Sequence, residues 1–309
     1  MKAYIWKRIL QLIPILMGIS VLTFLLLYLS PGDPAQKKLA AMETVIEQDV
    51  LDEMREEMGL NRPFIEQYMS WAAGILHGDF GTSYKDNTPV AKKLFHALVK
   101  TVILAFFAIL LTLVIAIPVG IYTAVRHGRA ADYLIRFFSF IGNSVPGFLL
   151  SVLLMYLFCI RVKWFPVIAK GSIRGLFLPV LALALPRISS FIRQIRAIVL
   201  EQLGKDYVHG QRCRGVKERY VLFKNVLHNS MISIITLLGL SIGGLMGGSV
   251  VIETIFGWQG IGKLVMDSIT ARDYPVIQGF VVIMAVIYVT VNLLTDISYR
   301  YLDPRVERN

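Results

Sequence analysis

The sequence predicts an all-α integral membrane protein with six transmembrane helices, an extracytoplasmic amphipathic lid between the first two, and a short cytoplasmic helix between the fourth and fifth. Two observations carry this prediction. Charged residues make up 17% of the 309 residues, whereas a soluble domain carries about 25%. Hydrophobic residues make up 55%, and they gather in long uninterrupted runs. Such a chain lacks the polar surface of a soluble domain, and its composition also excludes intrinsic disorder.

Length and composition define the spans. A bilayer core about 30 Å thick requires roughly 20 apolar residues in a helix. Five uncharged runs reach that length: 9–30, 101–125, 137–160, 230–252 and 274–295. A sixth span is expected at about 176–199 although it contains three arginines, because omitting it places later loops on the wrong sides. The first run exceeds the apolar region of a signal peptide and precedes no A-x-A-like site, so we expect a retained helix.

The distribution of Lys and Arg predicts which side each loop occupies. Of the 32 basic residues, 17 lie in the two terminal segments and in 126–136 and 193–224, which alternation places on the same side. The short loops of the other side carry four and two. Because short cytoplasmic loops are enriched in Lys and Arg, both termini are expected in the cytoplasm. The net charge of +11 therefore reflects topology, and no nucleic-acid partner is expected.

The segment 31–97 is the one extramembrane part long enough to fold. Apolar residues recur at helical spacing in 43–58 and 66–76, which predicts two amphipathic helices that form a lid. This lid is either a solvated cover over the outer mouth or a docking or gating surface, and the sequence is compatible with both. The predicted organisation is a first helix at 1–30, the lid at 31–97, a membrane core at 98–304 containing a loop at 201–229, and a tail at 305–309.

Proline and glycine mark where the middle spans are expected to bend or pack. Proline interrupts the helical hydrogen-bond ladder, so helices should kink or end at prolines. Five lie in or beside these spans: Pro118, Pro146, Pro166, Pro179 and Pro186. Small residues at four-residue spacing in the fifth span predict faces that allow close helix contact. They are Gly239, Gly243, Gly244, Gly247 and Gly248.

Two motif matches do not predict catalysis. The segment GWQGIGK at 257–263 fits a phosphate-binding loop, but Leu264 replaces the required Ser or Thr and no buried strand precedes it. The segment GLSIG at 239–243 fits a nucleophile elbow, yet it lies inside an apolar span. None of the five histidines falls near mid-membrane, and the two cysteines form no CxxC pair. The sequence therefore predicts no catalytic residue and no metal ligand.

The loop after the fourth span carries the most informative pattern. Residues 206–214 can form a short helix, Gly215 ends it, and 216–227 can begin the next. The sequence DYVHGQRCRGVKERYVLFKNVLHN resembles the EAA loop of binding-protein-dependent ABC importer permeases, in particular the dipeptide, oligopeptide and nickel branch. The segments LSPGDPA, HGDFGTSY, VIETIFGWQGIGKL, ARDYPVIQG and LDPR extend the resemblance over the whole chain. At His209-Gly210-Gln211 the chain departs from the family's small residues, so its helix is expected to pack somewhat differently.

The resemblance implies that different subunits carry out transport, ATP hydrolysis and substrate delivery. This chain would be one of two homologous permease subunits in a bacterial or archaeal cytoplasmic (inner) membrane, in contact with lipid. Two cytoplasmic ATPases would bind ATP and Mg²⁺, and an extracytoplasmic substrate-binding protein would deliver the cargo. The chain itself would bind no cofactor. The cargo would be short peptides or nickel, free or chelated, and the motifs leave that choice open.

The resemblance also implies which residues act. The short helix would be a coupling helix that converts ATPase closure into helix movement. Its residues are Asp206, Tyr207, Arg212, Arg214, Gly215 and Lys217, and the basic ones are expected to meet acids on the ATPase. The candidates for the pathway or its gate are Arg187, Glu253, Trp258 and Asp273. Arg187 is expected to face a cavity or a partner, whereas Arg193 and Arg196 can extend toward the cytoplasmic surface.

Two other classes of membrane protein make different demands on the sequence. An ion-driven secondary transporter requires acidic or His residues in mid-span, and the nearest is Asp296, close to the inner end of the last helix. An integral-membrane hydrolase requires a reactive Ser241. Neither class accounts for the loop between the fourth and fifth spans.

Overall fold

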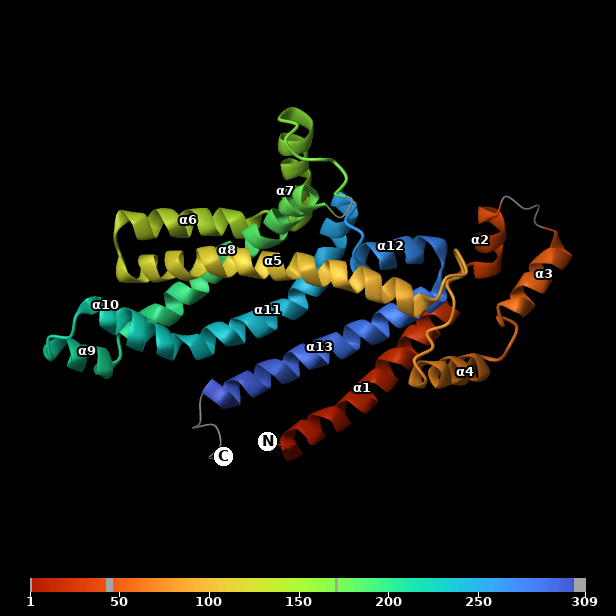
Figure 1. Cartoon of the computed structure of the whole chain (residues 1–309), viewed down its shortest axis with the longest axis horizontal. Helices are drawn as coiled ribbons and strands as arrows, with labels where there is room; N and C mark the ends of the chain where they lie inside the picture. Colours follow the sequence, from red (N-terminus) through yellow and green to blue (C-terminus); the bar gives the residue numbers. More distant parts are fainter. Residues whose placement is uncertain (1, 43–46, 170–171, 303–309) are drawn as a thin grey trace. The chain divides into compact units, whose positions relative to one another are not determined.

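The computed structural model describes residues 2–42, 47–169 and 172–302, which form helices and their connections (Figure 1). The chain divides into two compact units. Residues 1–101 with 259–290 form unit 1, and residues 102–258 with 291–309 form unit 2. Two helices, α5 (Val90–Val125) and α13 (Tyr274–Leu302), contribute residues to both units.

Unit 1 contains four helices of the N-terminal third and one from the C-terminal part. They are α1 (Lys2–Tyr28), α2 (Pro34–Ala41), α3 (Gln48–Glu57), α4 (Phe64–Leu76) and α12 (Ile261–Ala271). The two amphipathic helices predicted between the first two spans are confirmed by α3 and α4, although residues 43–46 of the first prediction lie outside the described residues. The sequence did not predict α2 and α12.

The short helices of unit 1 are held by a cap and by aromatic contacts. The Asp33 carboxylate caps α2 by accepting from the Ala35 N–H at 2.8 Å, and it also accepts from Arg55 Nε of α3 at 2.6 Å. Phe24 of α1 meets Phe64 of α4 with ring centroids 5.4 Å apart, in an edge-to-face arrangement. These contacts order a segment whose helices are too short to be stable alone.

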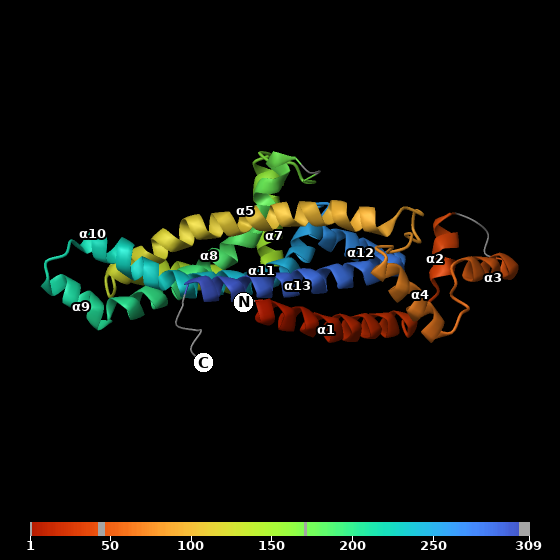
Figure 2. The same cartoon turned by 60° about the horizontal axis from the view of Figure 1, so that its bottom comes forward.

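Unit 2 is built around one long, buried helix. Its elements are α6 (Ala130–Ser144), α7 (Gly147–Met155) with the π-helical turn η1 (Tyr156–Arg161), α8 (Ile173–Leu203), α9 (Asp206–Cys213), α10 (Glu218–Tyr220), the π-helical turn η2 (Val221–Val226) and α11 (Leu227–Phe256). Helix α8 packs against α6, α7 and α11 (Figure 1, Figure 2). Its buried residues form the centre of the main hydrophobic core.

Four helical stretches among the described residues are long and apolar enough to cross a membrane. They are Val90–Val125, Ile173–Leu203, Glu218–Leu245 and Tyr274–Thr295. A fifth arises if α6 and the α7–η1 pair, bent by 94°, are one broken span, and α1 contributes a shorter apolar stretch, Ile13–Tyr28. The prediction of an all-helical membrane protein is confirmed.

Prolines and glycines have the expected effect at some positions only. Pro146 precedes α7 at the 94° bend, as predicted. Pro118, Pro179 and Pro186 lie inside α5 and α8, so of the two predicted outcomes, a kink or an end, the helix end does not occur there. A proline removes only one ladder hydrogen bond, and the packing around a long helix compensates for it.

The glycines of the fifth span allow close contacts within unit 2, as predicted. A side chain at Gly239 would collide with Thr295 of α13, 2.2 Å from its Oγ1. One at Gly244 would begin 2.9 Å from Arg187 Nη2 of α8. At Gly247 the corresponding position meets no described residue of another helix within 4 Å. Two of these glycines therefore bring helices together, and the third does not.

Candidate functional site

The connection between α8 and α11 forms the short helix that the sequence predicts. Asp206 occupies the first turn of α9, where a negative charge is favourable to the helix dipole. Gly215, with φ +72°, ends the helix: its N–H donates to the Arg212 carbonyl at 3.0 Å, and the Val216 N–H donates to the Gln211 carbonyl at 3.1 Å. Only glycine adopts this conformation without strain, which explains its place here.

One face of α9 is anchored in unit 2. Val208 is fully buried in the same core as Val221 and Val226. The Tyr207 hydroxyl donates to Gln202 Oε1 at the end of α8, at 3.1 Å. The Asn225 side-chain amide donates to Gln211 Oε1 at 2.8 Å. These contacts tie α9 to the end of α8 and to η2, which leads into α11.

The other face of α9 and the turn after it are exposed and mostly basic. The exposed residues include Asp206, His209, Gly210, Arg212, Cys213, Arg214, Lys217, Arg219, Tyr220 and Phe223. Arg212 is not a free charge, because its Nε and Nη2 pair with the Glu218 carboxylate at 3.1 and 2.5 Å. Phe223 leaves 63% of its surface exposed. The turn after α9 carries Arg214, Lys217 and Arg219 beside exposed aromatic rings, and this surface suits a groove lined by acidic residues.

Three pathway candidates lie in unit 2. Arg187 is half-buried on α8 beside Gly244 of α11. Glu253 is fully buried near the end of α11, about two and a half turns beyond Gly244. The Trp258 N–H donates to the Glu253 carbonyl at 2.8 Å, and the Trp258 side chain is buried. The structure thus brings Glu253 and Trp258 together at the turn that ends α11, and places Arg187 further along the same helix pair.

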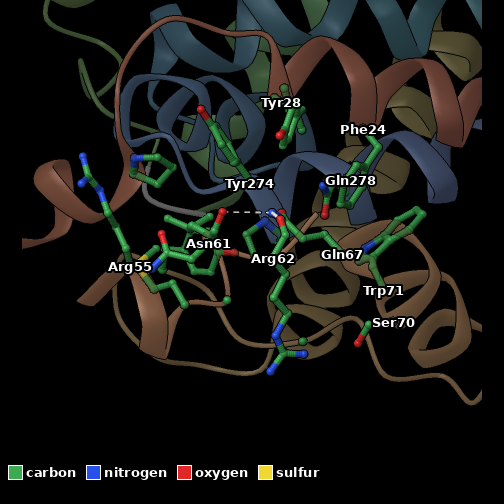
Figure 3. Close-up of a pocket in the computed structure, with 18 of the residues that line it drawn as sticks. Phe24, Tyr28, Arg55, Asn61, Arg62, Gln67, Ser70, Trp71, Tyr274 and Gln278 are labelled. Carbon is green, nitrogen blue, oxygen red and sulfur yellow. Dashed lines mark hydrogen bonds between the residues drawn. The ribbon is translucent and has the colours of Figure 1, made fainter. Parts of the chain in front are cut away.

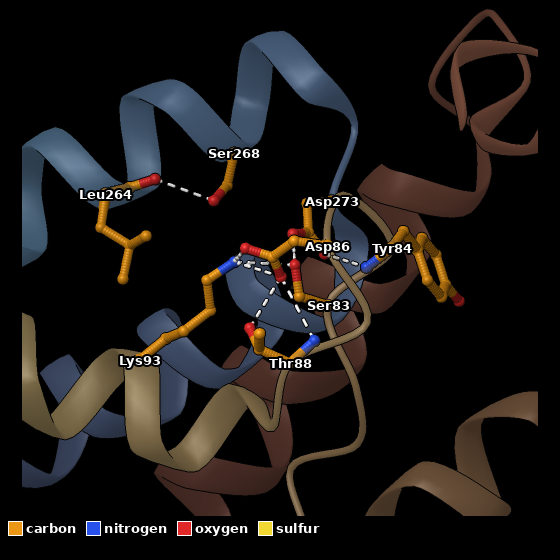
Figure 4. A network of polar contacts seen from close by, with 8 residues as sticks. All are labelled: Ser83, Tyr84, Asp86, Thr88, Lys93, Leu264, Ser268 and Asp273. Carbon is orange, nitrogen blue, oxygen red and sulfur yellow. Dashed lines mark hydrogen bonds and ion pairs between the residues drawn. The ribbon is translucent and has the colours of Figure 1, made fainter. Parts of the chain in front are cut away.

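The fourth candidate, Asp273, lies in unit 1 at the centre of a polar network (Figure 4). Its carboxylate is buried and accepts hydrogen bonds from Ser83 Oγ at 2.5 Å and from the Tyr84 N–H at 2.9 Å. Lys93 Nζ donates to Ser83 Oγ at 2.9 Å and pairs with Asp86 at 2.7 Å. Asp273 therefore joins the segments HGDFGTSY and ARDYP, which the sequence singled out without indicating that they meet.

The electrostatics of this network favour fixed protonation states. Burial raises the pKa of Tyr84 to about 12, and the negative charge of Asp273 contributes, so the hydroxyl stays protonated at neutral pH. Burial alone raises the pKa of Asp86. Hydrogen bonds from Lys93 and Thr88 outweigh that effect and hold this pKa well below its usual range. Asp86 thus stays ionised and paired with Lys93.

An ion pair between α6 and α8 escaped the sequence reasoning. Asp132, only 1% exposed, accepts from Arg196 Nε at 2.7 Å and from Nη2 at 2.8 Å. The Gly128 N–H donates to the same carboxylate at 3.1 Å. The Arg196 guanidinium therefore ends in an ion pair at the start of α6, in the segment 126–136 that the sequence places on the cytoplasmic side. The available signal was a single acid, Asp132, in the otherwise basic segment 126–136.

Comparisons with known proteins cover almost the whole chain. A family model described as binding-protein-dependent transport system inner membrane component matches residues 116–308. The model of the N-terminal part of such membrane components matches residues 1–105. A solved structure, the MetNI methionine ABC transporter in an inward-facing conformation, is similar with a TM-score of 0.57 and 17% identity. It covers 68% of this chain and 96% of the transporter chain, and this likeness concerns the fold alone.

Three curated relatives match over nearly their full lengths. The oligopeptide transport system permease protein AppB of Bacillus subtilis is 39% identical over 318 residues, covering 99% of this chain and 100% of the relative. The dipeptide permease DppB of Alkalihalophilus pseudofirmus is 33% identical over 335 residues, with coverage of 99% and 100%. The glutathione permease GsiC of Salmonella typhimurium is 35% identical over 306 residues, with coverage of 99% of both chains.

Proposed function

The chain belongs to the family of binding-protein-dependent transport system inner membrane components, and on that basis we propose that it is one of two permease subunits of an ATP-driven importer of short peptides. Full-length similarity to relatives named for oligopeptide, dipeptide and glutathione transport carries the proposal. These relatives give no support specific to nickel. As a permease, the chain is a non-catalytic subunit, and ATP is bound and hydrolysed by partner subunits.

The exposed face of α9 is the proposed contact with a cytoplasmic ATPase. Its buried face is tied to α8 and to the start of α11, so a push on α9 moves both helices together. Arg214 and Lys217 face solvent and offer charges to acids on the ATPase. Arg212 is paired with Glu218 across the turn around Gly215, and we propose that this pair braces the turn. Asp206 and Tyr207 support the start of the helix.

We propose a topology of six spans with both termini in the cytoplasm, in which α1 is the first span and α6 with α7–η1 is the third. The helices α2, α3 and α4 then form the extracytoplasmic lid. Cys213 provides a natural reporter, because it is exposed whereas Cys159, the other cysteine, is buried. A membrane-impermeant maleimide should modify Cys213 in inside-out vesicles and leave it unmodified in right-side-out vesicles, with Cys213→Ser as the unlabelled control. Labelling in right-side-out vesicles would contradict the topology.

Arg187 is the proposed pathway residue of unit 2, with Glu253 and Trp258 shaping a gate at the end of α11. A half-buried guanidinium in a membrane helix is costly unless it meets a partner or the cargo. Arg187→Leu should reduce peptide uptake by about tenfold, the effect of losing one charged hydrogen bond. Arg174→Leu, at the exposed start of α8, is the matched control. Unchanged uptake by Arg187→Leu would remove this residue from the pathway.

Uptake by the reconstituted system tests the proposed function. Proteoliposomes would hold this chain, its homologous partner permease and both ATPases, with the substrate-binding protein outside. We expect accumulation of a labelled tripeptide that requires ATP and every component. The alternative, a secondary transporter, predicts accumulation by this chain alone under an ion gradient. Accumulation without the ATPases would therefore overturn the proposal.

A further inference from the structure

Unit 1 contains a cavity of about 530 Å³ between the end of α1, the connection of α3 to α4, α4 itself and the start of α13 (Figure 3). Cavities of a few hundred cubic ångströms are the usual size of small-molecule sites. Its lining includes Phe24, Tyr28, Trp71, Tyr84, Tyr274 and Gln278. None of the functions proposed above for the coupling loop or for the pathway residues involves this cavity.

Two polar groups of the cavity have no partner in the described part of the chain. Gln278 is only 7% exposed and lines the cavity, and its side-chain amide makes no hydrogen bond to the described residues. The Trp71 indole N–H is buried and likewise lacks a partner among them. Both side chains project toward the middle of the group drawn in Figure 3. A buried polar group without a partner costs about 1–3 kcal/mol, so a ligand that accepts from the Trp71 N–H is favoured. The Gln278 amide lines the same cavity and is open to a ligand there.

Four charged residues line the cavity: Asp33, Arg55, Glu57 and Arg62. Glu57 and Arg62 are exposed. Arg55 is neutralised by Asp33 and Asp52 at 2.6 and 2.8 Å. The Arg62 side chain extends away from Gln278 and Trp71 (Figure 3). Tyr84 stays protonated, because burial raises its pKa to about 12. The centre of the cavity therefore presents neutral hydrogen-bonding groups beside aromatic rings, which matches an amide next to an apolar side chain better than a phosphate or a metal ion.

We propose that this cavity binds a short peptide through its backbone. The Gln278 amide can donate to a peptide carbonyl and accept from a peptide N–H, and Trp71 can donate to a second carbonyl. The rings of Phe24 and Tyr28 then cover an apolar side chain of the peptide. This inference rests on the proposed function, since peptide is the cargo, and adds a peptide site within unit 1 of the permease. The small volume favours a free peptide over a protein loop as the occupant.

Direct binding to the assembled importer tests the site. The two permease subunits and the ATPases would be placed in lipid nanodiscs without the substrate-binding protein. The probe is radiolabelled Ala-Phe-Ala carrying a photoactivatable diazirine. Gln278→Leu and Trp71→Phe should each raise the dissociation constant by about tenfold. Gln48→Leu and Trp164→Phe, which lie outside the cavity lining, are the matched controls and should bind like the wild type.

A modified ligand tests the site in the wild-type protein, so misfolding of a variant cannot explain the result. Ala-Phe-Ala methylated on its backbone nitrogens should bind the wild-type complex about tenfold more weakly, because it cannot donate to Gln278. Photo-cross-links of the parent peptide should map to residues 24–84 and 274–278. Equal affinity of both variants and of the methylated peptide, or cross-links confined to unit 2, would overturn the inference. Peptide uptake by the complete system is measured in parallel. If uptake persists while the cavity binds no peptide, this inference alone fails. If uptake is absent, the proposed function fails.

Discussion

Replacing Arg196 with glutamine is expected to lower the free energy of unfolding by about 3–5 kcal/mol, because it leaves a buried carboxylate without its partner. Asp132 is 1% exposed, and Arg196 contacts both of its oxygens at 2.7 and 2.8 Å. The pair joins α6 to the central helix α8. The Gly128 N–H satisfies only part of the remaining hydrogen-bonding capacity of the carboxylate.

Thermal unfolding of the purified chain in detergent measures this effect. Arg193→Gln, on the same helix, is the matched control and should change the transition little. Asp132→Asn combined with Arg196→Gln should recover part of the loss, because the buried charge is gone. A transition of Arg196→Gln that coincides with that of the wild type would show that the pair does not stabilise the fold.

Replacing Gly215 with valine is expected to separate ATP hydrolysis from transport. A β-branched residue is strongly disfavoured at φ +72°, where the hydrogen bonds that end α9 are formed. The turn should rearrange, and α9 then loses its fixed relation to the start of α11. We expect peptide uptake per ATP hydrolysed to fall by about tenfold, a change of about 1.4 kcal/mol in coupling, while hydrolysis continues.

Two further variants distinguish a loss of coupling from a general effect of backbone strain on the protein. Gly215→Asn should retain most of the coupling, because asparagine tolerates the left-handed conformation. Gly78→Val introduces the same backbone strain at φ +80° in unit 1, and its ratio of uptake to hydrolysis should match that of the wild type. A normal ratio in Gly215→Val would contradict the role assigned to α9.

The sequence predicted the elements whose signal is local. Apolar runs located four helical stretches long enough to cross a membrane. A glycine between two short periodic segments located the end of α9 at Cys213, one residue before the predicted boundary. The residues proposed for coupling do meet in one loop. The family resemblance was confirmed by matches over the whole chain. In these cases the deciding interactions lie within a few residues of one another.

Features that depend on distant partners were not predicted. The hydrogen bond between Ser83 and Asp273 joins residues 190 positions apart in the chain. The ion pair between Arg196 and Asp132 joins residues 64 positions apart on two helices. The 94° bend carried only a partial signal, Pro146, while Pro118 and Pro186 left their helices unbroken. Whether a helix bends or continues at a proline depends on the packing around it. A single sequence does not show that packing.

The rate at which Cys213 reacts with a maleimide tests most directly that the α9 loop docks on the ATPase. This thiol is exposed and lies between Arg212 and Arg214 on the proposed contact surface. In inside-out vesicles, the rate should fall to a small fraction when both ATPases are assembled on the permease pair, and recover when they are stripped away. Equal rates with and without assembled ATPases would contradict the proposal that this loop docks on the ATPase and couples ATP hydrolysis to movement of the membrane helices.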